Sequence, residues 1–355
     1  MDHLTSEERV LQALRFERPD RMPVYDSFWP EFVDAWRCEK ELGREADIND
    51  YYGNDVRIVV PDETPFPSAE GIVEQSKGCA VRRDGWGATH LFRGGAKFSQ
   101  VLDVPVPDKG LADQLSFQSP LLARRYPSVE EVRALRSRYC VFIKTGGPYL
   151  RTSNLRGTTQ WLIDLVEDVA FARELAMRVT RHITAVGLEA IRRYDLWHTG
   201  VWFYDDMGSN AGPMFSPQTF EQVFLPCYKW MCEQYRAAGV EHTILHCDGN
   251  IEPLLDMLID AGIQGIHPVE PKAGMDVVAL RARYGTSLAL LGGLDNAHVL
   301  PRSTLDELEA HVVRALEVGQ DGGLVIGAHS IGPDLSVERY DFVRRLIREH
   351  STGCR

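Results

Sequence analysis

The stretch Glu241–Pro271 reads EHTILHCDGNIEPLLDMLIDAGIQGIHPVEP and contains one structural unit twice. Val240–Leu245 is expected to form a short buried strand that ends in polar residues, and 251–261 a helix. A second apolar strand is expected over 263–268, and it is followed by Glu270. Apolar strands that alternate with helices and carry polar groups at their carboxyl ends are typical of a parallel α/β sheet with a site at that edge.

The composition indicates a soluble cytoplasmic protein that binds neither nucleic acid nor membranes. The formal net charge of -12 and the pI near 5.4 argue against nucleic acid or an anionic membrane as a partner. The seven cysteines are scattered without C-x-x-C spacing, which favours a reduced cytoplasm over a disulfide framework. The charged N-terminus has no apolar signal-like region, and no apolar run approaches the length that spans a membrane.

The alternation of strands and helices continues along the chain and predicts a (β/α)8 TIM barrel. Eight strands are the number that a closed barrel needs, and 355 residues suit a single barrel domain over 1–355. The expected strands are 22–28, 55–60, 139–144, 199–204, 240–245, 263–268, 287–291 and 323–326. A long helical region is expected over 158–194, with an apolar stripe at helical spacing.

One segment departs from this alternation. Residues 71–106 contain short alternating runs broken by glycine, which predict antiparallel hairpins inserted into the repeating fold. We interpret this segment as a hairpin flap within the barrel domain, not as a second domain.

Several polar residues fall at the predicted carboxyl ends of the strands. They are Asp26, Tyr149, Asp205, Asp206, His246, Asp248, Glu270, Asp295 and His329. Residues two apart in an extended segment face the same way, so His246 and Asp248 can point together into the barrel mouth. With His329 and Glu270 they could form an oxygen and nitrogen site for a divalent metal, zinc being the first choice, with an open position. A catalytic site without metal is the close alternative.

Structural roles for the same residues stay open at this point. Asp248 precedes Gly and Asn and could simply bend the chain and cap the next helix. His246 could be a core histidine, His329 could bond to backbone, and Asp205 with Asp206 could form a helix-entry turn. Neither a G-x-S-x-G nor a phosphate-binding G-x-G-x-x-G sequence is present.

Taken together, longer stretches resemble the uroporphyrinogen decarboxylase superfamily, which also contains methyltransferases that work with corrinoid proteins. The stretches are ERVLQALRFERPDRMPV, GGPYLRTSNLRGTTQWLIDLVED, YDDMGSN, FSPQTFEQVFLPCYKWM, LHCDGNIEPLLDMLIDAGIQGIHPVEP, YGTSLALLGGLDNAHVL and GGLVIGAHSI. The resemblance covers nearly the whole chain. It implies a (β/α)8 barrel with a deep site at the carboxyl end, and it suggests a homodimer.

Two departures place the chain closer to the methyltransferase branch. Porphyrinogen decarboxylases carry an RQAGR-like segment after the first strand, whose arginines receive the substrate carboxylates, whereas this chain has YDSFWPEF. The methyltransferases hold zinc with a His-x-Cys pair and a later Cys. The matching positions here are His246, Asp248 and His329, which replace the thiolates by harder or neutral ligands.

The leading hypothesis is therefore a zinc-assisted methyltransferase or demethylase. It would move a methyl group from a small methylated substrate, such as a methoxylated aromatic, a methylamine or methanol, to a corrinoid supplied by a partner protein. The assigned residues are His246, Asp248 and His329 as metal ligands, Glu270 as a possible fourth ligand, Asp206 or Glu270 as an acid, and Tyr149 and Asp205 as substrate-positioning groups. The flap around Trp86 would exclude water.

Two alternatives come from other classes of protein. One is a decarboxylase of a tetrapyrrole or a small aromatic acid, in which Asp26 or Asp205 stabilises the protonated ring, His329 orients the substrate, and Arg151 or Arg156 receives carboxylates. The other is a non-catalytic protein that binds a corrinoid or tetrapyrrole.

Overall fold

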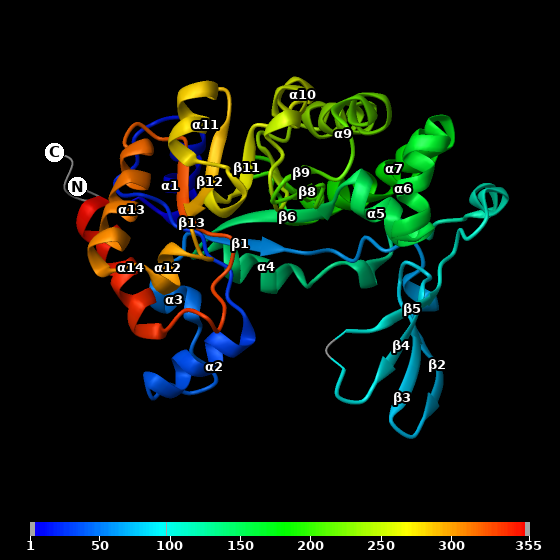
Figure 1. Cartoon of the computed structure of the whole chain (residues 1–355), viewed down its shortest axis with the longest axis horizontal. Helices are drawn as coiled ribbons and strands as arrows, with labels where there is room; N and C mark the ends of the chain where they lie inside the picture. Colours follow the sequence, from blue (N-terminus) through cyan, green and yellow to red (C-terminus); the bar gives the residue numbers. More distant parts are fainter. Residues whose placement is uncertain (1–3, 97, 352–355) are drawn as a thin grey trace.

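A curled parallel sheet of seven strands forms the centre of the computed structural model, which describes residues 4–96 and 98–351 (Figure 1). Its spatial order is β1-β6-β7-β10-β11-β12-β13, and all neighbours are parallel. The strands are β1 (Val56–Val59), β6 (Cys140–Gly146), β7 (Val201–Tyr204), β10 (Thr243–His246), β11 (Gly265–Val269), β12 (Ala289–Leu294) and β13 (Leu324–Ala328). The predicted parallel α/β class, with a TIM-like arrangement, is confirmed.

The predicted first strand over 22–28 is not a regular strand. It makes two isolated parallel bridges to the last part of the sheet, Val24 with Ile326 and Phe28 with Ile331. On its other side the Asp55 N–H donates to the Val24 carbonyl at 2.8 Å, so the segment lies between β13 and β1. The Val24 N–H donates to the Asp55 carboxylate at 2.9 Å, and Pro23 has no N–H, which leaves too few backbone donors for a ladder.

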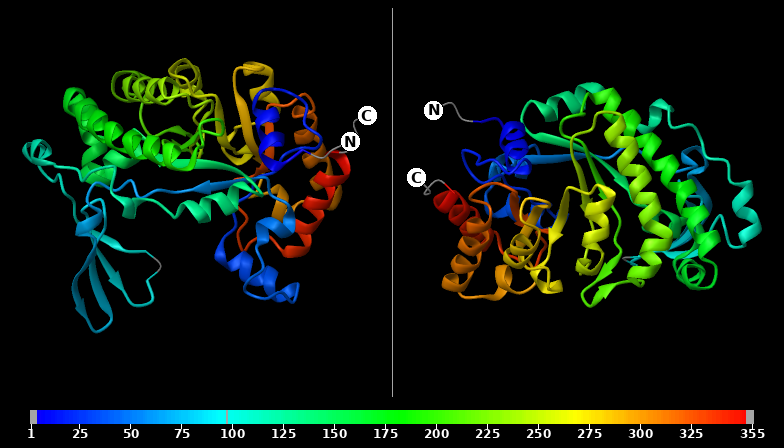
Figure 2. Two further views of the ribbon diagram at one scale, coloured as in Figure 1. Left: turned by 180° about the vertical axis from the view of Figure 1, so that it is seen from behind. Right: turned by 90° about the horizontal axis from the view of Figure 1, so that it is seen from above.

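Helices cover the outer face of this sheet, as both views in Figure 2 show. They are α1 (Ser6–Leu14), α2 (Pro30–Glu39), α3 (Ile48–Tyr52), α4 (Val129–Arg136), α5 (Pro148–Arg156), α6 (Thr158–Glu167), α7 (Val169–Tyr194), α8 (Pro217–Thr219), α9 (Leu225–Ala237), α10 (Leu255–Ala261), α11 (Val277–Tyr284), α12 (Val299–Arg302), α13 (Leu305–Val318) and α14 (Val337–Ser351). In the described ranges no helix combines the length and apolar character that crossing a membrane requires.

The helical region predicted over 158–194 is two helices, α6 and α7. The break lies at Asp168, whose φ of -147° and ψ of 70° are not helical. The Asp168 carboxylate accepts a hydrogen bond from the Phe171 N–H at 3.2 Å and one from Lys109 at 2.7 Å. Asp168 therefore caps α7, a role in which a short acidic side chain is favoured over continued helix.

The segment predicted as hairpins forms a separate antiparallel sheet of four strands. They are β2 (Gly71–Ser76), β3 (Cys79–Arg83), β4 (Thr89–Arg93) and β5 (Gln100–Asp103), paired in that order. Figure 1 shows this sheet projecting from the body of the molecule, and every residue of β2 and β5 is exposed. A second antiparallel pair, β8 (Gly208–Ser209) with β9 (Gly212–Pro213), follows β7.

Side chains alternate between two cores on either side of the main sheet. Phe142, Trp202 and Ile244 belong to the cluster inside the curl, and each is at most 1% exposed. Their chain neighbours, such as Val141 and Phe203, pack outward against the helices. Because the period of a strand is two residues, a residue two positions beyond an inward one also faces the interior. The period of two therefore determines which polar residues point into the open end of the curled sheet, at the carboxyl ends of its strands.

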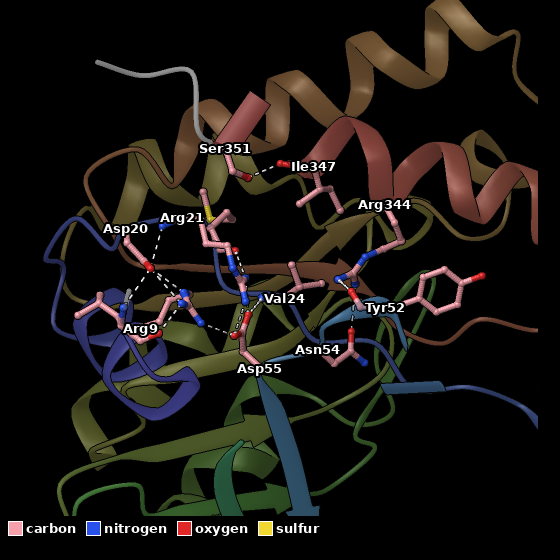
Figure 3. A network of polar contacts seen from close by, with 12 residues as sticks. Arg9, Asp20, Arg21, Val24, Tyr52, Asn54, Asp55, Arg344, Ile347 and Ser351 are labelled. Atoms are coloured by element: carbon pink, nitrogen blue, oxygen red, sulfur yellow. Dashed lines mark hydrogen bonds and ion pairs between the residues drawn. The ribbon is translucent and has the colours of Figure 1, made fainter. Parts of the chain in front are cut away.

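A buried charge network anchors the N-terminal segment beside β1 (Figure 3). The Asp55 carboxylate is fully buried and accepts hydrogen bonds from Arg9 Nη1 at 2.7 Å and from both terminal nitrogens of Arg21 at 2.8 Å. Arg9 is also held by Asp20, with an Nε to Oδ1 distance of 2.6 Å. These bonds tie the segment that ends in Val24 to the edge of the sheet.

Candidate metal centre

Three donor atoms converge at the carboxyl ends of the strands. His246 is the last residue of β10, Asp248 follows it by two positions, and His329 directly follows β13. Asp248 Oδ1 lies 3.2 Å from His246 Nε2 and 3.2 Å from His329 Nε2. The three residues form a group whose possible ligand atoms all lie within 4.8 Å of one another. The structure thus brings together the three side chains that the sequence pointed to.

The spacing of these atoms fits a single small cation. Ligand atoms about 2.0–2.2 Å from a tetrahedral zinc ion lie roughly 3.3–3.6 Å apart, close to the two observed distances. Asp248 Oδ1 is buried and makes no hydrogen bond of ordinary geometry, which is costly for a carboxylate oxygen. A bound divalent cation would satisfy it. Two imidazoles and one carboxylate suit zinc and other borderline metals.

His246 is held from both sides of its ring. Its ring stacks on that of Tyr204, with centroids 3.7 Å apart and an interplanar angle of 9°. Its Nδ1 lies 2.7 Å from Nδ1 of His267, so one of the two nitrogens must donate to the other. Burial lowers the pKa of His246 well below its usual value, so the imidazole is neutral. A neutral, oriented imidazole is the form that binds a metal.

Glu270 faces His329 and is not one of the three residues whose donor atoms converge. Its Oε1 lies 3.3 Å from His329 Nδ1, the ring nitrogen that faces away from Asp248. Lys272 contacts the same oxygen at 2.8 Å, and the Gly249 N–H donates to Oε2 at 2.9 Å. Burial alone would raise the pKa of Glu270, but the bonds from His329, Lys272 and Gly249 hold it at about 2. This low pKa does not fit the predicted role of Glu270 as a proton donor, whereas its role as a fourth ligand stays a prediction.

His329 experiences the field of both carboxylates around it. Burial lowers its pKa, but the hydrogen bond to Glu270 and the charges of Asp248 and Glu270 outweigh burial, and the net shift is upward. The same negative field that favours a protonated His329 also favours a metal cation at this point.

The adjacent acids Asp205 and Asp206 have different environments. Asp205 is fully buried and accepts hydrogen bonds from the N–H groups of Tyr149 and Leu150, at 3.0 and 2.6 Å, and from the Tyr228 hydroxyl at 2.8 Å. Burial raises its pKa to about 7 despite these bonds. Asp205 therefore holds the start of α5, and direct contact with a substrate, as the sequence suggested, does not fit its complete burial.

Asp206 faces the mouth. Its side chain is 39% exposed, and Oδ1 lies 3.7 Å from His246 Nε2. Burial raises the pKa of Asp206, and the charge of Asp248 raises it further. An accessible carboxyl with a raised pKa beside the cluster is suited to donate a proton.

The remaining predicted residues lie in structural positions. The Tyr149 ring is 4% exposed and packs against the rings of Phe215 and Phe224, at centroid distances of 5.1 and 5.8 Å. Burial and the charge of Asp205 raise the pKa of Tyr149 to about 12. Asp295 accepts from two backbone N–H groups at 2.8 Å and caps a loop.

Asp26 belongs to a buried network, away from the three donor atoms. Its carboxylate accepts hydrogen bonds from the Ala328 N–H at 2.7 Å and the Tyr340 hydroxyl at 2.8 Å, and it lies 3.4 Å from Arg344. Burial raises the pKa of Asp26. With 2% of its surface exposed, Asp26 is not placed to touch a substrate ring.

The two arginines considered as carboxylate receptors are both engaged. Arg156 is 4% exposed and binds Asp164 at 2.6 Å. Arg151 Nε lies 2.6 Å from Glu63, and the guanidinium lies 5.5 Å from the ring of Trp86. Trp86, in the connection between β3 and β4, is itself buried.

Sequence reasoning missed Lys144, the one charged residue within the apolar run CVFIKTG of β6. It faces the interior, two residues beyond Phe142, and its Nζ lies 3.2 Å from the centre of the Tyr204 ring. A charged residue at an inward position of a predicted strand is the signal that could have identified it.

The fold and the position of the site define a TIM-barrel-like protein that carries its polar residues at the carboxyl ends of the parallel strands. The family model described as uroporphyrinogen decarboxylase (URO-D) matches residues 105–350, so the chain belongs to this family, as the sequence stretches predicted. No curated protein sequence matches the chain.

Solved structures align with nearly the whole chain. A methyltransferase from Methanosarcina mazei aligns with a TM-score of 0.69 and 19% identity over 98% of this chain and 99% of that chain. A B12-independent methionine synthase from Shewanella sp. W3-18-1, in complex with selenomethionine, aligns with a TM-score of 0.44 and 14% identity over 94% of each chain. At these identities the likeness concerns the fold alone, and the second match carries no further argument.

Proposed function

We propose that the protein is a metal-dependent methyltransferase that moves a methyl group from a small methylated substrate to a corrinoid held by a partner protein. The observation that carries the proposal is the convergence of His246 Nε2, Asp248 Oδ1 and His329 Nε2 on one point. Membership of the URO-D family and the shared fold of the Methanosarcina mazei methyltransferase support it.

His246, Asp248 and His329 would hold the metal, with zinc as the expected ion. When bound, the ion supplies Lewis acidity that polarises the heteroatom carrying the methyl group. Binding through Nε2 requires His246 to carry its proton on Nδ1, which then donates to His267 Nδ1 at 2.7 Å. It requires the same of His329, whose Nδ1 proton faces Glu270. Glu270 thus favours this tautomer of His329, and the contact with His267 is compatible with the same tautomer of His246.

Asp206 would act as the proton donor. As the methyl carbon forms a bond to the acceptor, its bond to the heteroatom breaks and the electron pair stays on the heteroatom. A proton from Asp206 then neutralises that charge, which the raised pKa of this exposed carboxyl favours. Asp205 positions the start of α5 and, through it, Tyr149. The region around Trp86 is the part of the predicted flap that lies next to Arg151 and could limit entry of water.

Decarboxylation has weaker support. It needs free cations for substrate carboxylates, and Arg151 and Arg156 are bound to Glu63 and Asp164. Asp26 is enclosed by Tyr340 and Arg344.

The proposal is tested by metal content and methyl transfer together. Purified protein should contain one equivalent of a divalent metal by mass spectrometry. The metal should be lost from His246→Ala and kept in His198→Ala, since His198 is paired with Glu7 at 2.9 Å and is not one of the converging donors. With cob(I)alamin as acceptor, the wild type should demethylate at least one of a methoxylated aromatic, a methylamine or methanol. Protein without metal and without transfer to cob(I)alamin would exclude the proposed chemistry.

A further inference from the structure

Lys144 is a cation inside the curled sheet that forms no ion pair with any described residue. Its Nζ contacts the face of the Tyr204 ring, and among the described residues no carboxylate forms an ion pair with it. Glu63 and Asp206 act on it only at longer range, and Glu63 is already bound by Arg151 at 2.6 Å.

The strand register places Lys144 beside the candidate metal centre. Gly146, Tyr204 and His246 are consecutive partners across β6, β7 and β10. Lys144 precedes Gly146 by two residues and faces the same way. Gly146 itself has no side chain, and the Arg151 side chain takes up the space where its Cβ would be. Its Nζ, 3.2 Å from the Tyr204 centroid, lies within about 7 Å of the His246 ring, because the two rings are 3.7 Å apart.

An ammonium in such a place is unfavourable without a counter-ion. Burial, followed by the charge of Arg151, lowers the pKa of Lys144 to about 8, so most of the population is still charged at neutral pH. An anion that enters the mouth would relieve this cost, and it would lie beside the Tyr204 ring that Lys144 contacts. A methylammonium substrate would be repelled by the lysine, and methanol would leave it without a partner.

We propose that Lys144 receives an acidic group of the substrate, so that the methyl donor is an aromatic acid and not a methylamine or methanol. This inference rests on the proposed function, for which it names the substrate class. Lys144 is thus the specificity-determining residue of the mouth. Its cation holds the acidic end of the ligand while the methylated end lies toward His246.

Binding of two probes that differ only in charge tests this assignment without any turnover. The probes are 4-methoxybenzoate and the neutral 4-methoxybenzamide, measured by isothermal titration calorimetry at pH 7 with metal-loaded protein, and 2- and 3-methoxybenzoate are measured in parallel. Wild type should bind the best benzoate about 10- to 100-fold more tightly than its amide, the range for a hydrogen bond to a charged group. Lys144→Met should abolish this preference, and Lys144→Arg should keep it.

A lysine elsewhere provides the matched control. Lys229 is 51% exposed and paired with Asp260, and Lys229→Met should behave as wild type. If Lys144 only held the Tyr204 ring in place, Lys144→Met would weaken benzoate and amide binding alike. That result, an unchanged preference in Lys144→Met, or no binding of any methoxybenzoate at millimolar concentration would each overturn the inference.

The two proposals can fail separately. Benzoate binding that depends on Lys144, in a protein that transfers no methyl group, would refute the methyltransferase proposal alone. Methyl transfer from methanol or a methylamine that is unaffected by Lys144→Met would refute the substrate assignment alone.

Discussion

Replacing Glu270 by Gln separates a supporting carboxylate from a metal ligand. In the wild type the Glu270 Oε1 faces His329 Nδ1 at 3.3 Å, and only 3% of the side chain is exposed. Gln keeps the shape and can still accept from the Gly249 N–H with its carbonyl oxygen. Its amide nitrogen would then face His329 Nδ1 as a donor. The His329 imidazole would then carry its proton on Nε2. Nε2 would no longer offer the metal a lone pair.

The expected loss is moderate. Removing a partner of a ligating histidine typically weakens metal affinity 10- to 100-fold, which corresponds to about 1.4–2.7 kcal/mol. Competition with a chromogenic chelator at pH 7 measures this, and full occupancy should return at high metal concentration. Glu252→Gln is the matched control, because Glu252 is paired with Arg283 on the surface.

Two results would refute this reasoning. Unchanged affinity would mean that Glu270 does not set the His329 tautomer. Complete loss of the metal at any concentration would mean that Glu270 is itself a ligand.

Three further perturbations have defined outcomes. Asp206→Asn should lower kcat about 10²- to 10⁴-fold with unchanged metal content, as expected for loss of a general acid, and equal loss of metal would contradict that role. Affinity for 4-methoxybenzoate should fall as pH rises through about 8, because Lys144 then loses its proton, and Lys144→Arg should show no such fall in the same titrations. Asp55→Ala should destabilise the fold by about 3–5 kcal/mol in urea unfolding, since it removes the buried carboxylate that binds Arg9, Arg21 and the Val24 N–H, and a loss below about 1 kcal/mol would show that the network is dispensable.

The sheet could be predicted well from sequence because its strands are short and apolar throughout. For seven of the eight predicted strands, the observed bounds differ from the prediction by only a few residues. The segment over 22–28 has the same apolar appearance, but Val24 gives its N–H to the side chain of Asp55. The Asp55 carboxylate lies 31 positions further along the chain and takes the place of a backbone acceptor on a neighbouring strand. The residues around Val24 alone give no sign of this contact.

The site could be predicted only in part. His246 and Asp248 share a face because of the period of a strand, and His329 joins them because the sheet curls. Asp205 and Asp206 are adjacent in sequence but have different environments. The residues around them do not reveal that the first N–H groups of α5 donate to Asp205 and not to Asp206. Lys144 was overlooked because a single lysine in an apolar strand resembles a residue at an exposed edge.

The contact between the Asp26 carboxylate and the Ala328 N–H joins residues 302 positions apart. During synthesis, the segment around Val24 leaves the ribosome long before Ile326, its bridging partner, has been made. The apolar surface of this segment therefore stays without its native partner, loosely packed or bound by a chaperone, until β13 has been synthesised. Nascent chains stalled before β13 should thus be far more sensitive to protease around residue 24 than the released protein.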